Sequence, residues 1–312
     1  MSPHPPAPKL PPTRLRVPCS TSNLGPGFDC LGLALSLWLD VELIGASDTT
    51  AHVLASAAGT ASEWPRSRNL LFEAFDRVFE HRGIPPLRAE FRVDSEIPLE
   101  RGLGSSGAAV AAGLLLANAC VHDAVGLDEL AQLGMQLEGH PDNSTASLFG
   151  GCTLGVPLGN GLRVLQPELS TDLRFAVAWS DAKLATDRAR AALPSEVPFA
   201  DAVENPRRLA LLLEGLKRAD PELLSAGGQD ALHVAHRLPL IPGGAAALRA
   251  ATDAGAWMAT ISGAGSALVA ITDEAHCAAV GDAMADALQA RAEWTEHRAL
   301  ATALDTPKPS CD

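Results

Sequence analysis

The sequence predicts an α+β protein made of two layered domains. The chain has 312 residues, which is long enough for one large or two medium domains. Strand-like and helix-like segments alternate in its second half, and a glycine- and proline-rich stretch, LGVPLGNGLRV, interrupts the chain near residue 160. We therefore expect domains over residues 13–160 and 161–305. Residues 1–12, half of them proline, are expected to be a disordered tail, and residues 306–312 a frayed end.

In the first half, one strand and two helices follow from their residue patterns. Apolar and polar residues alternate over residues 87–94, which predicts a half-buried strand. Residues 105–120 are rich in alanine and leucine and contain no proline, so we expect a buried helix. Residues 127–140 carry leucines at helical spacing, and this spacing predicts a second helix with Glu138 near its end.

The second half predicts strands and helices packed in layers. Residues 174–180 form an apolar strand, and residues 205–220 form a helix with Asn205 as N-cap and Pro206 in the first turn. The remaining expected elements are a helix over 243–255, strands over 257–262 and 267–272 around a tight turn, a helix over 274–292, and a strand near Trp294.

Charge and cysteine usage exclude several classes of function. The net charge of −13 argues against nucleic acid or an anionic membrane as a main partner, since both attract basic surfaces. No apolar run reaches the roughly 18 residues that span a bilayer. The six cysteines form no CxxC pair, and we find no signal peptide, so we expect free thiols and a cytoplasmic protein.

A glycine loop over residues 98–108, PLERGLGSSGA, predicts an anion-binding site. It joins a strand to a helix, so free backbone N–H groups and the helix dipole can face a phosphate. The lysine of the common phosphate-binding pattern is absent, so N–H groups and a metal would have to balance the charge. Ser106 could ligate that metal through its hydroxyl. The alternative is a tight turn whose small residues serve packing alone.

Three further stretches carry polar or glycine residues suited to a small ligand. Residues 17–35 read as a polar loop between apolar segments, with Asn23 and Asp29 placed to bind a polar substrate. Residues 138–151 read as a loop at a helix end, and residues 262–271 contain a second glycine turn. The polar residues of the second stretch are Glu138, His140, Asp142 and Asn143. Each stretch could instead be an ordinary surface turn.

Together these stretches resemble the GHMP kinase superfamily. The loop PLERGLGSSGA and the turn SGAG are similar to motifs of the whole superfamily. STSNLGPGFD (20–29) and EGHPDN (138–143) are more specific and resemble the homoserine kinases, as do ARAALP (189–194) and HVAHRLPLIPGG (233–244). The resemblance runs from about residue 14 to about residue 303. It implies a ribosomal S5-like N-terminal domain and a ferredoxin-like C-terminal domain, with ATP and substrate between them.

The resemblance assigns residues to ATP and Mg²⁺. Ser106 and Glu138 are expected to hold Mg²⁺ on the phosphates, which suits a hard cation that takes few protein oxygens. Without the surrounding motif, Glu138 would read as a solvated carboxylate at a helix end. The expected ATP-binding residues are Pro98, Leu99, Glu100, Arg101, Gly102, Leu103, Gly104, Ser105, Ser106, Gly107, Ala108 and Asn69.

The implied second substrate is L-homoserine, which offers an ammonium, a carboxylate and a primary hydroxyl. Asp29, with Asn23 beside it, is expected to bind the ammonium. Arg190 and Arg237 are expected to bind the carboxylate through paired hydrogen bonds. The remaining assignments are Gly263 at the substrate and His140 and Asn143 as catalytic residues near the hydroxyl. Either arginine could instead be a solvated surface residue, and Arg188 could be mistaken for Arg190.

Some superfamily members have an aspartate base at the position that matches Asn143. An amide cannot accept the proton at neutral pH, so the resemblance implies catalysis by positioning and charge neutralisation. The proton could then pass to the γ-phosphate itself.

The sequence departs from the family pattern at Ser144-Thr145, where Val-Ala is usual, and at Gly265-Ser266-Ala267, where Gly-Pro-Thr is usual.

The alternative functions are a kinase for threonine or pantoate and a regulator that binds nucleotide without turnover. The arginine pair with Asp29 favours an amino acid over pantoate, and the intact Ser106 and Glu138 argue against a regulator. The oligomeric state, a homodimer included, stays open.

Overall fold

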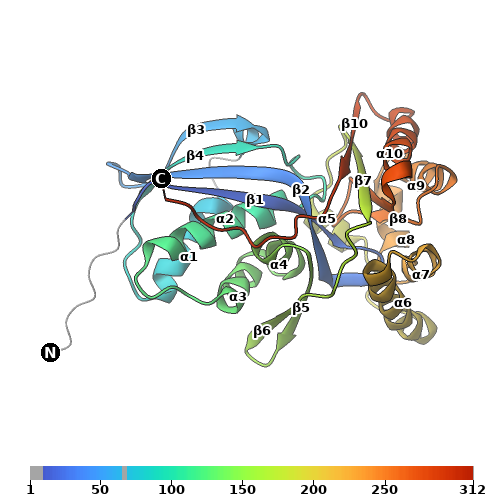
Figure 1. The fold of residues 1–312 in the computed structure, drawn as a ribbon, viewed down its shortest axis with the longest axis horizontal. Helices are drawn as coiled ribbons and strands as arrows, with labels where there is room; N and C mark the ends of the chain where they lie inside the picture. Colours follow the sequence, from blue (N-terminus) through green and yellow to red (C-terminus); the bar gives the residue numbers. More distant parts are fainter. Residues whose placement is uncertain (1–9, 65–68, 312) are drawn as a thin grey trace.

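The structure is a computed structural model that describes residues 10–64 and 69–311. It contains two β-sheets, each with helices packed against it (Figure 1). The α+β class expected from the sequence is therefore confirmed. Most of the N-terminal tail predicted over residues 1–12 lies outside the described residues.

The first sheet is organised around one long strand. This strand, β2 (Gly27–Ala46), pairs antiparallel with β1, with β4 along its second half and with β5 along its first half. Strand β3 adds to β4 in parallel, and β6 adds to β5 antiparallel. The other strands are β1 (Thr13–Asn23), β3 (Val53–Gly59), β4 (Ala89–Ser95), β5 (Cys152–Leu158) and β6 (Gly161–Leu165). The pairing of β6 with β5 carries this sheet past residue 160, where we expected the domain boundary.

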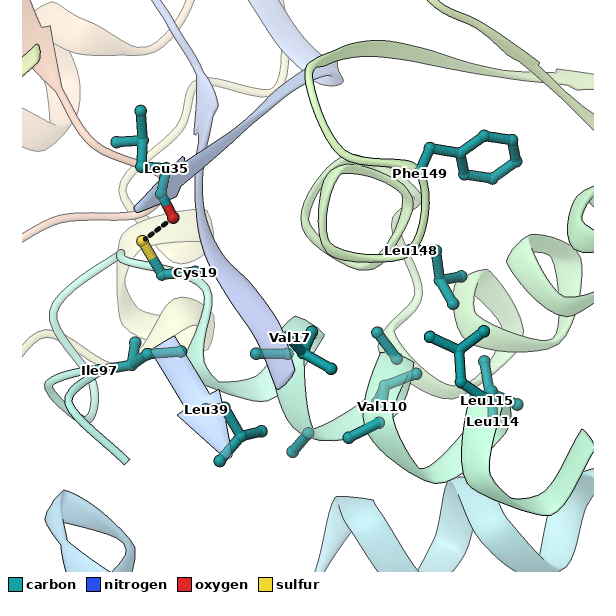
Figure 2. Close-up of a cluster of buried hydrophobic side chains, with 14 of the residues drawn as sticks. Val17, Cys19, Leu35, Leu39, Ile97, Val110, Leu114, Leu115, Leu148 and Phe149 are labelled. Carbon is teal, nitrogen blue, oxygen red and sulfur yellow. Dashed lines mark hydrogen bonds between the residues drawn. The ribbon is translucent and has the colours of Figure 1, made fainter. Parts of the chain in front are cut away.

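Four helices cover one face of the first sheet (Figure 1). They are α1 (Leu70–His81), α2 (Ser105–Cys120), α3 (Leu127–Glu138) and α4 (Asp142–Phe149), and a short 3₁₀ helix, η1 (Thr60–Glu63), follows β3. Helix α2 is apolar on all sides and lies in the centre. Figure 2 shows its Val110 and Leu114 among Val17 and Leu39 of the strands and Leu148 of α4. Because α2 is enclosed in the core, its N-terminus is held in a fixed position.

The second sheet is fully antiparallel, in the order β10-β7-β9-β8. Its strands are β7 (Arg174–Ser180), β8 (Met258–Ile261), β9 (Leu268–Thr272) and β10 (Thr295–Leu300). Helices α9 (Gly244–Asp253) and α10 (Glu274–Gln289) pack on it, and α6 (Phe199–Arg218) packs on α7 (Pro221–Gly227). The short helices are α5 (Thr186–Ala191), α8 (Val234–Arg237) and the 3₁₀ helix η2 (Leu238–Leu240).

Two stretches that we expected to be loops are regular structure. Residues 17–35 belong to β1 and β2, and only residues 24–26 form the turn between them. Residues 142–149 form α4, so the expected loop over 138–151 is largely a helix. Both stretches contain many polar side chains that point into a site or into backbone hydrogen bonds, which hides the apolar periodicity of a strand or helix.

The N-cap expected at Asn205 is wrong. Helix α6 begins at Phe199, and Pro206 lies inside it. Asn205 is buried, where its Nδ2 donates to the Pro26 carbonyl at 3.1 Å and its Oδ1 accepts from the N–H of Ala231 at 3.0 Å. This side chain therefore holds the β1–β2 turn against the second domain instead of starting a helix.

The C-terminal segment, expected to be frayed, is docked on the first domain. After β10 the chain runs back across the first sheet, drawn in red in Figure 1. Arg14 and Ser310 exchange two backbone hydrogen bonds of 2.8 Å, and Thr306 donates to the Phe149 carbonyl at 2.9 Å. The segment is short and polar, so its sequence carries no sign of partners that lie far along the chain.

The six cysteines are free thiols. Burial raises the pKa of Cys19 to about 12, and its Sγ donates to the Leu35 carbonyl (Figure 2). A thiol in this state is a packing group with little reactivity. Within the described residues, no helix combines the length and the apolar character needed to cross a membrane.

Candidate active site

A cavity of about 510 Å³ lies where the two domains meet, and it gathers most of the predicted site residues. It is lined by the glycine loop, the end of β1 and the start of β2, the start of α4, and segments of the second domain around α5 and α8. The predicted residues on its wall are Asn23, Asp29, Asn69, Pro98, Leu99, Glu100, Arg101, Gly102, Leu103, Gly104, Ser105, Ser106, His140, Asn143, Arg190, Arg237 and Gly263. Glu138, Gly107 and Ala108 do not form part of its lining.

The glycine loop ends in a tight approach to β1 and α4. Gly104 precedes α2 with a φ of 69°, and a Cβ there would lie 2.0 Å from the Oγ of Ser20. A Cβ on Gly107 would lie 2.8 Å from the Cβ of Asn143. Only glycine fits these positions, so the N-termini of α2 and α4 come close to one another. The unpaired N–H groups of a helix start favour an anion at this point.

Ser106 and Glu138 form a hydrogen-bonded pair beside the loop. The Ser106 Oγ donates to Glu138 Oε1 at 2.9 Å, and Glu138 Oε2 is buried without a partner. Burial raises the pKa of Glu138, and the charge of His140 opposes that rise only in part. The buried Ser144 hydroxyl, which makes no hydrogen bond itself, lies close enough to lower the pKa of Glu138. Because neither oxygen has a formed hydrogen bond, Oε2 is suited to a bound cation. No group of three or more His, Cys, Asp or Glu side chains in the described part of the chain forms a metal cage. The pair therefore suits Mg²⁺ that takes its other ligands from phosphate and water.

Asp29 and Arg190 are joined across the two domains. The two carboxylate oxygens of Asp29 accept from Arg190 NH1 and NH2 at 2.8 and 2.7 Å. Asn23 ends β1 and Asp29 lies near the start of β2, and the two have positive φ values of 68° and 55°. Asn23 Oδ1 accepts from the backbone N–H of Asp29 at 2.9 Å, which fixes the carboxylate. The side chains that we expected to bind opposite ends of the substrate thus bind each other in this structure.

Arg237 is a buried cation with no carboxylate partner among the described residues. The residue is 1% exposed, and its guanidinium donates only to the carbonyls of Ala189 and Gly263, at 3.3 and 3.4 Å. Its guanidinium lies 4.9 Å from the centre of the Phe28 ring. Burial and the nearby charge of Arg190 lower the pKa of Arg237. A buried charge is costly until it is paired, so this position favours a ligand anion.

A polar chain runs from His140 to Ser20 at the start of α4. His140 Nδ1 lies 2.7 Å from Asp142 Oδ1, which also accepts from the backbone N–H of Asn143 at 2.9 Å. Ser20 Oγ donates to Asn143 Oδ1 at 3.0 Å. Burial lowers the pKa of His140, but the hydrogen bond and charge of Asp142 outweigh it and raise the value. Asn143 Nδ2 also donates to Asp142 Oδ1, at 3.4 Å, so one N–H of this amide remains to donate to a ligand.

Two predicted ATP-binding side chains have structural partners. Arg101 donates to the carbonyls of Ser180, Leu99 and Asp181 at 2.7, 2.8 and 3.2 Å. It joins the glycine loop to the second domain. Asn69, expected among the ATP-binding residues, caps α1 by accepting from the N–H of Leu71 at 3.0 Å while it lines the cavity.

The cavity also includes residues that the sequence reasoning missed. Lys183 and Thr186 stand just before the ARAALP stretch, and Trp64 lies at the end of η1 with a buried Nε1 that has no partner. The sequence gives little indication that these residues belong to the site. Lys183 is one of only four lysines and lies within a few residues of a motif that we singled out.

Comparisons with known proteins agree with this geometry. The model of the GHMP kinases N terminal domain matches residues 69–151, and the model of the GHMP kinases C terminal domain matches residues 212–290. The chain therefore belongs to the GHMP kinase family, and the two-domain fold expected from the resemblance is confirmed.

Several of its relatives are homoserine kinases. One from a Synechococcus strain is 39% identical over 304 residues, covering 94% of this chain and 96% of the relative. One from Gloeobacter violaceus is 40% identical over 273 residues, with coverage of 87% and 91%. The crystal structure of homoserine kinase from Cytophaga hutchinsonii superimposes with a TM-score of 0.86 at 27% identity, covering 96% and 97% of the two chains.

Proposed function

We propose that this protein transfers the γ-phosphoryl group of ATP to the side-chain hydroxyl of L-homoserine. ATP is the nucleotide expected of a GHMP kinase, and the homoserine kinases named above support the choice of acceptor. The product would be O-phospho-L-homoserine, an intermediate on the route to threonine. The residues of the cavity support each part of this reaction.

One observation carries the choice of an amino acid as acceptor. Arg237 is a buried guanidinium that lacks a counter-ion among the described residues, and it shares the cavity wall with Asp29 and Arg190. An amino acid brings a carboxylate for Arg237, which has no counter-ion, and an ammonium that can share Asp29 with Arg190. The Asp29–Arg190 pair is about one-third exposed, so it can open or share its hydrogen bonds at modest cost.

The phosphate end of the reaction would lie over the N-terminus of α2. The backbone N–H groups of Ser105 and Ser106 would bind phosphate oxygens, and Ser106 with Glu138 would hold Mg²⁺. When bound, Mg²⁺ supplies charge neutralisation on the phosphates. The orphaned Oε2 of Glu138 supports this assignment.

The transfer itself would need no strong base. Asp29 is paired with Arg190, and Asp142 already accepts from His140 and Asn143. Asn143 Nδ2 and His140 would hold the acceptor hydroxyl in line with the γ-phosphorus. The hydroxyl oxygen forms the new P–O bond as the bond to ADP breaks, and its proton passes to a phosphoryl oxygen. A loose transition state permits this because alignment contributes more than proton removal.

Phosphorus NMR of the reaction mixture tests the proposal. The protein with ATP, Mg²⁺ and L-homoserine should produce ADP and a new phosphate monoester in equal amounts. Release of inorganic phosphate in place of the ester would refute the assignment of homoserine as acceptor.

A further inference from the structure

The glycine loop lacks the lysine that usually balances the negative charge of a nucleotide's phosphates. Another cation on the cavity wall could supply that charge. Four Lys or Arg side chains among the described residues line it: Arg101, Lys183, Arg190 and Arg237. Three of them already have hydrogen-bond partners. Arg101 donates to three carbonyls, Arg190 to Asp29, and Arg237 to two carbonyls.

Lys183 differs from the other three. Its Nζ lies 3.7 Å from Glu63 Oε2 and 3.9 Å from Glu100 Oε2, which is beyond hydrogen-bond distance in both cases. Its side chain is 47% exposed, so the ammonium is free to reorient toward a ligand. Glu100 belongs to the glycine loop, so Lys183 lies beside that loop and lines the same cavity.

The backbone around Lys183 is fixed to the same loop. The N–H of Leu184 donates to the Glu100 carbonyl at 3.1 Å, and Arg101 holds the carbonyls of Ser180 and Asp181. The Oγ of Ser266 donates to the carbonyl of Ala182. Arg101, the arginine of the glycine loop, therefore anchors the segment that carries Lys183. The same segment continues into α5, which carries Arg190.

We propose that Lys183, contributed by the second domain, binds the phosphates of ATP and takes the place of the missing loop lysine. The ammonium also neutralises Glu100 and Glu63, which would otherwise repel the nucleotide. The inference rests on the proposed ATP site but is independent of the acceptor.

Direct binding measurements with the full chain test this, because they need no acceptor and stay informative if homoserine is not the substrate. Lys183→Met should weaken ATP binding about tenfold, the loss expected for one hydrogen bond to a charged group. Adenosine, which has no phosphate, should bind within about twofold of the parent value, and Lys183→Arg should retain most of the ATP affinity. The matched control is Lys217→Met, because Lys217 has 48% exposure and its own carboxylate partner, Glu168, at 3.1 Å.

The same substitution in a Glu100→Gln protein distinguishes phosphate binding by Lys183 from simple neutralisation of the charge on the glycine loop. If Lys183 only offset Glu100, then Lys183→Met in a Glu100→Gln protein would leave ATP affinity unchanged. The proposal expects the loss of about tenfold to persist there. Unchanged ATP affinity in this background, or an equal loss for ATP and adenosine, would overturn it.

Discussion

Replacement of Glu138 by glutamine removes a charge from the proposed metal site and keeps the shape of the side chain. Metal stabilisation of a transferring phosphoryl group is worth several kcal/mol. At about 1.4 kcal/mol for each factor of ten, we expect kcat to fall at least about a hundredfold. The amide oxygen can still accept from Ser106, so binding of ATP without metal should change by no more than about threefold.

The structure also predicts the direction in which the same substitution changes the free energy of unfolding. Burial raises the pKa of Glu138 in the folded protein, so loss of its proton above the ordinary glutamate pKa costs folding free energy. A neutral glutamine avoids this cost, and Tm at neutral pH should be unchanged or higher. The matched control is Glu129→Gln on the same helix, whose carboxylate pairs with His81. Near-normal turnover of Glu138→Gln at saturating Mg²⁺ would refute the metal assignment.

Three further predictions concern the two substrates and the fold. Arg237→Leu should lower kcat/KM for L-homoserine at least about tenfold, since a hydrogen bond to a charged group is worth about 1.5–3 kcal/mol. The analogue 3-aminopropan-1-ol lacks the carboxylate, so it should be a poor substrate whose kcat/KM hardly changes with the substitution. An equal fall for both substrates would mean that Arg237 supports the architecture. Ser105→Val should weaken ATP binding about tenfold with a normal melting curve, whereas bulk at Gly104 would collide with Ser20; unchanged ATP affinity would make the loop a packing turn. For Asp76, burial raises the pKa, but hydrogen bonds from His52 and Arg88 outweigh it and the net value is lowered, so the stability it contributes is present above about pH 4 and lost as pH falls through the folded pKa. Asp76→Asn should therefore lower Tm at pH 7, and this loss should shrink steadily as the pH falls below about 4. A loss of Tm that does not depend on pH would contradict this account.

Elements with a clear apolar pattern could be predicted from the sequence. The helix over 105–120 and the strand over 174–180 have the bounds expected for them, because their burial follows from local composition. The long strand β2 and helix α4 were missed where polar residues line the site. Asn205 was misassigned because a buried asparagine that bonds to two distant backbone groups looks the same in sequence as a helix cap.

The candidate site could be predicted as a set of residues but not as an arrangement. The motifs identified side chains that the fold brings around one cavity. They could not show that Asp29 pairs with Arg190, or that Arg101 bonds to the second domain, because those contacts depend on how the domains pack. Lys183 was missed for the same reason, since nothing in its own segment relates it to a loop about 80 residues earlier.

The central claim is that the cavity selects an amino acid with a primary hydroxyl as its phosphoryl acceptor. It is tested most directly by kcat/KM for L-homoserine, L-threonine and pantoate in a coupled assay of ADP release. We predict that L-homoserine is preferred at least about tenfold over each of the others, because it satisfies both Asp29 and Arg237 and presents an unhindered hydroxyl. Preference for threonine or pantoate, or ADP release that no acceptor stimulates, would contradict the account.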